Sequence, residues 1–177
     1  METDEHRYSL SEVNRFDRGA FVRMIGPVFE HSPWIAETAW AMRPFADIAA
    51  LHRALCQTVT EAGEPKKLAL ICAHPDLVGH AALAGSLTAA STREQANAGL
   101  NRLSPEEISL FQRYNQEYRE KFGFPFVICA RLNKKEAILG GFDKRLKHTR
   151  AEEIAAALEE ISKIAWLRLQ DILAEGK

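Results

Sequence analysis

An apolar run from Leu68 to Ala73 leads directly to His74, which is followed by Pro75 and Asp76. A proline disfavours the helical conformation of the residue before it, so we expect His74 to lie where the apolar element ends. A histidine titrates near neutral pH and can therefore exchange a proton with a substrate. The sequence indicates an acid–base residue at this junction, whereas the plainer interpretation is a capping or surface histidine.

Asp76 and His80 lie close enough to His74 in the chain to suggest a metal site. The two histidines, however, are six residues apart, which is neither the helical i, i+4 pair nor another known ligand signature, and no further Cys or His cluster supports a site. We therefore predict that no metal is bound. A metal-dependent hydrolase that uses these three residues stays as an alternative.

The segment STREQANAGL places Ser91 and Glu94 in the spacing of a capping box, which predicts that a helix begins at Ser91. Gln95 follows directly. A helix N-terminus offers free backbone N–H groups that suit an anionic or carbonyl-rich ligand. The segment is thus either a helix start alone or a helix start that also binds a ligand.

Arg168 interrupts the apolar face of a helix predicted near the end of the chain. Such an arginine either extends from the edge of the face to solvent or is buried with a partner, because an isolated buried charge is costly. The edge position is the plainer interpretation. A buried Arg168 would require a carboxylate from the protein or from a substrate.

Helix signals dominate the rest of the chain. Thr149 with Glu152, and Ser104 with Glu107, have the capping-box spacing, and Gly123 is placed to end the second of these helices. Further helices are predicted within residues 16–26 and 43–63, the first ended by a Gly-Pro pair.

The apolar runs 68–73 and 122–130 have compositions that suit either a buried strand or a buried helix. Isolated strands among helices would lack partners. We therefore predict an all-α, single-domain multi-helix bundle over residues 1–177.

Composition excludes several classes of function. The 23 basic and 24 acidic residues give a net charge of -1 and are scattered, which argues against nucleic-acid binding. No apolar stretch approaches the roughly 20 residues of a membrane span, and neither end carries a recognisable targeting signal. Three widely spaced cysteines, each among apolar neighbours, suit reduced thiols in the core. We expect a soluble cytoplasmic protein without a bound nucleotide.

Taken in order, the motifs FEHSPW, AHPDL, STREQANAGL, FQRYNQEYREKFGFPFVICAR and EEISKIAWLRL resemble one family. This is the family of 2-oxo-4-hydroxy-4-carboxy-5-ureidoimidazoline (OHCU) decarboxylases, which complete the conversion of urate to (S)-allantoin. The resemblance runs from about Leu10 to Ile172. It implies an all-helical fold, a homodimer and catalysis without a cofactor on a small ureidoimidazoline substrate.

The resemblance also implies which residues form the active site. The catalytic residues would be His74 as acid or base, Glu94 as its partner or an orienting group, and Arg168 for electrostatic stabilisation or ion pairing. Substrate contacts are implied for these residues: Pro75, Ser91, Thr92, Arg93, Glu94, Gln95, Phe126, Val127, Ile128, Cys129 and Ala130. In the last five, we expect an unpaired main chain that is available to the substrate ring. The alternative from another class is a non-catalytic helical interaction protein.

Overall fold

The structure, a computed structural model, describes residues 7–174, without the side chains of residues 80 and 81. Within that range the chain forms helices and connecting segments, and its β-type pairing is an isolated bridge between Tyr8 and Leu173. The predicted all-α fold class is confirmed. The chain divides into two compact units, Met1–Leu70 with Ser162–Lys177 (unit 1) and Ile71–Ile161 (unit 2).

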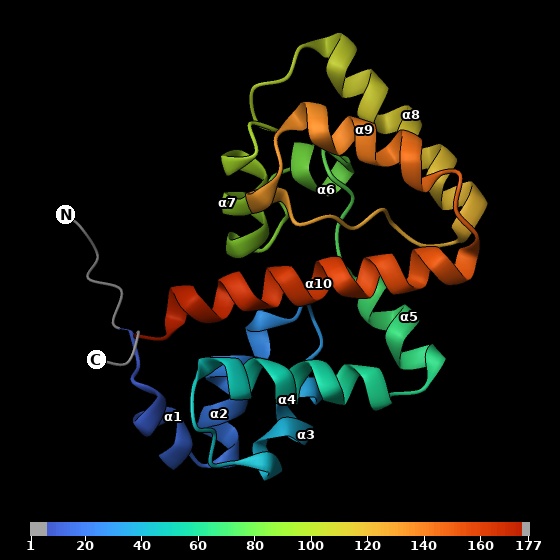
Figure 1. Ribbon diagram of the computed structural model, residues 1–177. Helices are drawn as coiled ribbons and strands as arrows, with labels where there is room; N and C mark the ends of the chain where they lie inside the picture. The colour runs from blue at the N-terminus through green and yellow to red at the C-terminus, as the bar shows by residue number, and fades with distance from the viewer. Residues whose placement is uncertain (1–6, 175–177) are drawn as a thin grey trace, which may run out of the picture. The chain divides into compact units, whose positions relative to one another are not determined.

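Figure 1 shows the helices of each unit. Unit 1 holds α1 (Leu10–Arg15), α2 (Arg18–Ile25), η1 (Gly26–Val28), α3 (Trp34–Ala39), η2 (Trp40–Met42) and α4 (Ile48–Glu61). Unit 2 holds α6 (His80–Leu83), α7 (Ala89–Asn97), α8 (Pro105–Phe122), η3 (Ala130–Leu132) and α9 (Lys135–Arg145). The boundaries of the units fall inside α5 (Glu64–Ala73) and α10 (Arg150–Ile172).

In unit 1, helix α3 packs against both α2 and α4. The segment between η2 and α4 is held by two polar side chains. Asn14 makes a double hydrogen bond with the main chain of Phe45, at 2.9 and 2.8 Å. The Arg43 guanidinium donates to the carbonyls of Asn14 and Phe16 and lies 4.2 Å from the centre of the Trp40 ring. Both side chains therefore hold distant stretches of main chain together through hydrogen bonds.

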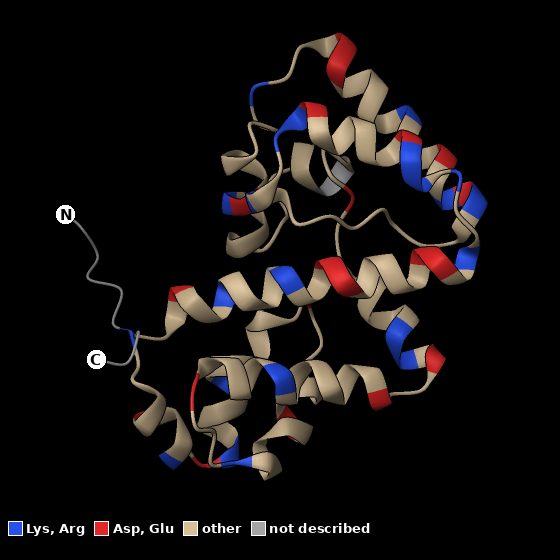
Figure 2. Cartoon of the chain, in the orientation of Figure 1, with Lys and Arg blue, Asp and Glu red and all other residues tan. Residues whose placement is uncertain are grey.

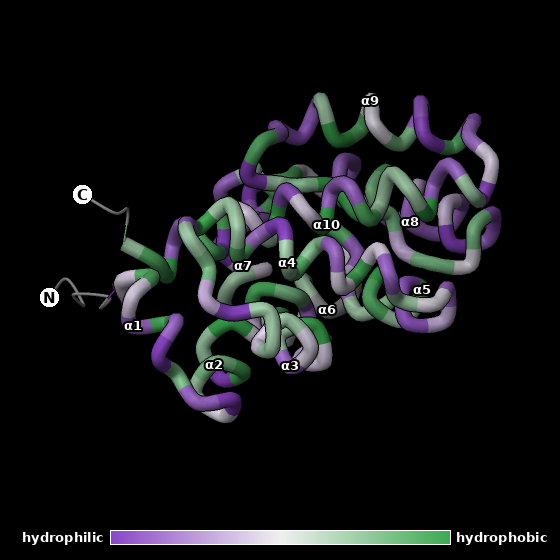
Figure 3. Tube along the Cα trace, turned by 60° about the horizontal axis from the view of Figure 1, so that its bottom comes forward, coloured by the Kyte–Doolittle hydropathy of each residue, from purple (hydrophilic) through white to green (hydrophobic). Residues whose placement is uncertain are grey.

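In unit 2, α8 packs on α9 around a cluster of aromatic rings. Tyr118 contacts the rings of Phe122, Phe126 and Phe142, and the last two stack at 3.9 Å between centroids. Figure 3 shows the alternation of hydrophobic and hydrophilic residues along α8 and α9 that permits this packing. The cluster fixes the end of α8 against the chain that follows it.

Helix starts and ends agree with the capping signals in most places. Ser104 and Glu107 form a capping box at the start of α8, and Gly123 ends this helix in the left-handed conformation with φ 82°. Thr149 and Glu152 form the same reciprocal bonds before α10. These predicted boundaries are confirmed because each depends on residues close together in the chain.

The two ambiguous apolar runs have different structures. Residues 68–73 form the last turns of α5, whereas residues 124–129 are extended and belong to no helix or strand. Cysteines 56, 72 and 129 are all free, as expected. The expectation that all of them are core residues is wrong for Cys72, which is exposed.

Charged residues of both signs are interleaved along the helices, most visibly on α8 (Figure 2). None of the helices in the described part of the chain combines the length and the apolarity that crossing a membrane requires.

We predict opposite effects for the same substitution at two glycines. Gly123→Ala should lower the free energy of unfolding by about 1 kcal/mol, because an L-residue is strained at positive φ. Gly140→Ala should raise it by about 0.5–1 kcal/mol, since Gly140 lies inside α9 with open space where the added methyl group would lie. Urea denaturation of both variants measures this, and equal signs would contradict it.

Candidate active site

His74 is the first residue after α5, where the sequence placed it. Its main-chain N–H donates to the carbonyl of Ile71 at 3.1 Å, and the residue is only 6% exposed. The interpretation as a surface histidine is therefore wrong. A buried imidazole at a helix end is instead positioned by the structure around it.

The loop that follows His74 is held by polar side chains from two helices. Gln95 of α7 accepts a hydrogen bond from the N–H of Val78 at 3.1 Å, and its amide N–H reaches the Asp76 carbonyl at 3.5 Å. Asn115 of α8 donates to the carbonyl of Leu77 at 2.8 Å. The loop needs these partners because buried main-chain groups outside regular structure must still be hydrogen-bonded.

Asp76 itself is bound by Arg119, whose Nε lies 3.0 Å from both carboxylate oxygens. The pair is partly exposed, so it orients the loop more than it stabilises the fold. Among the described residues there is no group of His, Cys, Asp and Glu that could hold a metal ion. The side chain of His80 lies outside the described residues, and the absence of a metal stays a prediction.

The start of α7 differs from the prediction. The helix begins at Ala89, and Thr88 rather than Ser91 caps it, accepting the Ser91 N–H at 3.2 Å. Thr88 is a good cap and two alanines follow it, so the helix forms a turn earlier than the Ser91–Glu94 spacing suggested. Ser91 and Glu94 are therefore inside the helix.

The predicted contact residues of α7 lie on different sides of it. Ser91 and Gln95 are buried, and Glu94 is half-buried. Thr92 and Arg93 are exposed. A helix turns by about 100° per residue, so five consecutive residues cannot all face one ligand.

Residues 126–130 (the FVICA segment), which run extended into η3 at Ala130, are largely buried but not free of partners. The carbonyl of Val127 accepts a hydrogen bond from Arg145 at 2.5 Å. The N–H of Cys129 donates to Glu160 at 2.8 Å. The expectation of an unpaired main chain is wrong at these two groups, which side chains satisfy because the segment has no neighbouring strand. It is also wrong at the carbonyls of Cys129 and Ala130, which accept hydrogen bonds from the main chain of Leu132 and Asn133.

Three of the predicted stretches come together around α7 in unit 2. Helix α7 packs against η3, whose first residue, Ala130, ends the FVICA segment. Burial, and then the charges of Glu160 and Glu94, raise the pKa of Cys129, so Glu94 lies within electrostatic reach of this segment. Gln95 holds the loop that carries His74 and Pro75.

Arg168 lies in unit 1 and is 6% exposed, so the edge interpretation is wrong. Its Nη1 is 2.9 Å from Oε2 of Glu30, a residue that is itself buried. The same nitrogen lies 3.4 Å from the Val28 carbonyl. The required carboxylate is therefore supplied by the protein.

Sequence reasoning missed the residues that hold the site in place. Asn115 lies on the apolar stripe of α8 together with Phe111, Tyr118 and Phe122, and all four are buried. A polar residue within an apolar stripe is the same signal that drew attention to Arg168. It would have identified Asn115 as well.

Comparison with known proteins identifies the family. The sequence profile described as OHCU decarboxylase matches residues 14–170. The chain belongs to the OHCU decarboxylase family. This confirms the resemblance found in the sequence and the expected class of enzyme, a carboxy-lyase.

Two relatives illustrate the match. The chain is 41% identical over 166 residues to the 2-oxo-4-hydroxy-4-carboxy-5-ureidoimidazoline decarboxylase of Haloferax volcanii, covering 94% of this chain and 96% of that protein. It is 40% identical over 164 residues to the decarboxylase of the same name from Amia calva, covering 93% and 94%.

Solved structures show the same architecture. The crystal structure of an (S)-allantoin synthase superposes with a TM-score of 0.73 at 27% identity, covering 94% of this chain and 54% of that longer chain. An OHCU decarboxylase crystallised in the presence of (S)-allantoin superposes with a TM-score of 0.64 at 20% identity, covering 78% of this chain and 89% of the other. The latter likeness concerns the fold.

We predict that Asn115→Leu lowers decarboxylase activity more than it lowers stability. The leucine removes the hydrogen bond to the loop that carries His74, which costs about 1–3 kcal/mol of stability and leaves that loop free to move. Activity at a temperature where the variant is folded should fall about tenfold or more. The assay is the rate of OHCU loss, with melting monitored by circular dichroism.

Asn14→Leu is the matched control, because the Asn14 side chain also forms hydrogen bonds with the main chain of another segment, at Phe45 in unit 1. It should lose stability and keep the activity per folded molecule. Equal losses of activity in both variants would contradict a specific role for Asn115.

Proposed function

We propose that this OHCU decarboxylase converts its substrate to (S)-allantoin, the last step of urate degradation, with His74 as the acid–base residue and without a cofactor. The observation that carries the proposal is the family match over residues 14–170, which includes every residue assigned a role below. The buried position of His74, next to the loop that Gln95 of α7 holds, supports its role.

The substrate itself accounts for the proposed absence of a cofactor. Loss of CO₂ leaves an electron pair on a ring carbon, and the adjacent C=N bond can delocalise this pair. The substrate thus supplies the electron sink that pyridoxal phosphate or thiamine provides elsewhere. The protein has to hold the carboxylate out of the ring plane and deliver a proton to one face.

His74 is the proposed proton carrier. Its imidazole can interact with the hydroxyl on the reacting carbon and donate the proton that fixes the configuration of the product. Because the ring is buried, water competes little for these protons. Glu94, half-buried on α7, is proposed to orient the ureido N–H groups of the substrate or to set the protonation state of His74.

The proposed substrate contacts comprise Pro75, residues 91–95 and the FVICA segment. Within the α7 group, burial favours Ser91 and Gln95 as the residues that face the interior, together with the half-buried Glu94. Peptide groups of residues 126–130 are proposed to bind the amide edges of the ring. Residues 126–128 support that role most directly, because they precede η3 and no helix uses their peptide groups.

For Arg168 two roles are compatible with the sequence: electrostatic stabilisation of the reaction, or an ion pair in the core. The 2.9 Å contact with Glu30 supports the second, since this carboxylate already compensates the positive charge. A direct role would require the Arg168 charge to act on the substrate despite Glu30.

We further propose a homodimer and a cytoplasmic location, as the resemblance implies. The free thiols of the chain support a reducing compartment. The family match spans both compact units and supports their action as one domain over residues 1–177. Light scattering tests the dimer, which should have twice the 19.9 kDa mass of the chain.

The central test uses fresh OHCU, generated from urate by the two preceding enzymes, in the presence of EDTA. Circular dichroism should report optically active allantoin appearing faster than in the uncatalysed decay. His74→Asn should abolish this acceleration, a loss of at least about 100-fold for a proton-transfer residue. The control His52→Asn alters a half-buried histidine of α4 and should remain active.

The outcomes separate the competing functions. A wild-type trace that matches uncatalysed decay would favour the helical interaction protein, and full activity of His74→Asn would eliminate the proposed mechanism. A loss of activity with EDTA, together with stoichiometric metal in the purified protein, would favour the hydrolase built on His74, Asp76 and His80.

A double substitution decides the role of Arg168. Arg168→Met alone removes the cation that lies 2.9 Å from the buried Glu30 carboxylate and should cost about 3–5 kcal/mol of stability. Glu30→Leu combined with Arg168→Met should restore most of this stability. If Arg168 serves only as an ion pair, the double variant keeps its decarboxylation rate. A rate that stays low in the folded double variant would show a catalytic role.

A further inference from the structure

A fully buried carboxylate lies at the centre of a polar network in unit 2. Glu153 is 0% exposed, and its Oε2 accepts hydrogen bonds from Arg145 Nε at 2.9 Å and from the hydroxyl of Tyr118. Its Oε1 lies 2.7 Å from Nδ1 of His148. Both oxygens of the carboxylate are therefore satisfied.

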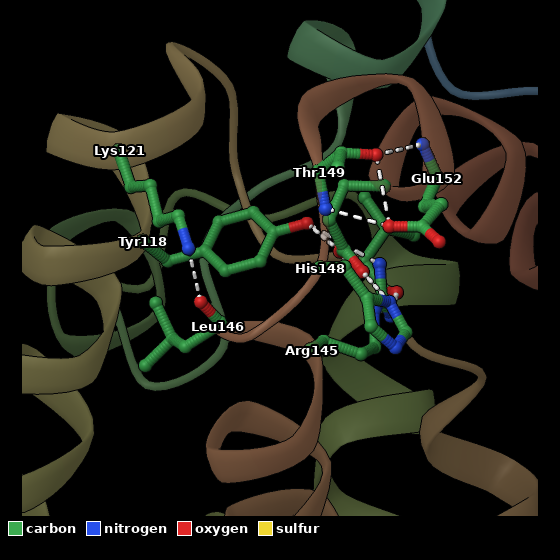
Figure 4. A network of polar contacts seen from close by, with 9 residues as sticks. Tyr118, Lys121, Arg145, Leu146, His148, Thr149 and Glu152 are labelled. Carbon is green, nitrogen blue, oxygen red and sulfur yellow. Dashed lines mark hydrogen bonds and ion pairs between the residues drawn. The ribbon is translucent and has the colours of Figure 1, made fainter.

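The network joins elements that are distant in the sequence. Tyr118 comes from α8, Arg145 is the last residue of α9, and Glu153 lies in the first turn of α10. Figure 4 shows the Tyr118 hydroxyl directed toward the side where Arg145 and His148 lie. Burial and the bond to Glu153 raise the pKa of Tyr118, so its hydroxyl remains a donor at physiological pH.

Arg145 extends the network to the FVICA segment. Its Nη1 donates to the carbonyl of Val127 at 2.5 Å, and its guanidinium lies 4.4 Å from the centre of the Phe126 ring. The planar guanidinium presents its N–H groups in a fixed fork. Once Glu153 holds Nε, the direction of Nη1 toward Val127 is set.

Stability alone does not explain a buried ion pair at this place. Burying two charges costs several kcal/mol per ion, and apolar side chains of similar volume are often as stabilising. What the pair provides is a directed donor for a main-chain carbonyl that has no strand partner. Glu160 performs the complementary task at the N–H of Cys129.

We propose that Arg145 and Glu153 are positioning residues that fix the FVICA segment so that its peptide groups meet the amide edges of the substrate ring. The inference rests on the proposed function of that segment. In an extended chain successive residues point to opposite sides. With Val127 and Cys129 anchored, the orientation of the intervening peptide is determined, and a rotation at Val127 would turn it away from the ring.

Arg145→Lys tests the proposal. A lysine keeps the positive charge for Glu153, but its single ammonium group cannot also hold the Val127 carbonyl in the geometry of a fork. Because peptide contacts to the ring act in both the ground state and the transition state, their loss should raise KM for OHCU by about tenfold or more, with a smaller change in kcat.

The matched control is Arg43→Lys in unit 1. The Arg43 guanidinium also donates hydrogen bonds to main-chain carbonyls and lies over an aromatic ring. Its substitution therefore removes the same kinds of interaction from a different loop. It should lower the melting temperature without raising KM. An unchanged KM in folded Arg145→Lys, or an equal rise in Arg43→Lys, would overturn the positioning role.

Hydrogen exchange supplies a readout that is independent of activity. Amide exchange in peptides covering residues 126–130 should be faster in Arg145→Lys than in the wild type and unchanged in Arg43→Lys. If Arg145→Lys does not fold, Glu153→Gln replaces it, since the amide keeps the shape but removes the charge that orients Arg145. Unchanged exchange and KM in that variant would overturn the proposal.

The same experiment separates this inference from the proposed function. A wild-type protein that does not accelerate OHCU loss would refute the proposed function, and the assigned role of the FVICA segment with it. An active wild type with an unchanged KM in the variants would refute only the positioning role of Arg145 and Glu153.

Discussion

Buried main chain outside regular structure must find hydrogen-bond partners, and the candidate site is organised by this constraint. The loop after His74 and residues 126–129 of the FVICA segment belong to neither helix nor strand. Side chains satisfy them instead: Asn115 bonds the carbonyl of Leu77, and Arg145 bonds the carbonyl of Val127. These bonds fix segments that would otherwise be free to move. Polar residues buried among the helices therefore hold the site in place.

This constraint explains polar residues on apolar helix faces. Asn115 and Tyr118 lie on the buried stripe of α8, and Glu153 and Arg168 lie on the buried face of α10. Each charged residue pairs with a group of its own compact unit: Glu153 with Arg145, and Arg168 with Glu30. A helix in this protein thus contributes apolar packing and directed hydrogen bonds from one face.

Such an arrangement suits a decarboxylase whose substrate carries its own electron sink. The proposed task of the protein is to hold a ring in one orientation and to move a proton, which rigid supports and one buried histidine can accomplish. The family match and the architecture shared with the (S)-allantoin synthase agree with a helical scaffold for this chemistry. Burying these charges costs stability, and what the protein gains from it is a fixed orientation of the groups that they hold.

The sequence by itself determined the features that depend on neighbouring residues. These include the capping boxes before α8 and α10, the position of His74 at the end of α5, and the family. It misplaced the start of α7 because two possible caps, Thr88 and Ser91, lie within one turn, and the helix-forming alanines after Thr88 extend the helix to the earlier cap. The partners of Arg168, Asn115 and Arg145 were decided by tertiary structure. Hydrogen bonds between residues far apart in the chain leave no local pattern, since any helix can bring any carboxylate or carbonyl to them.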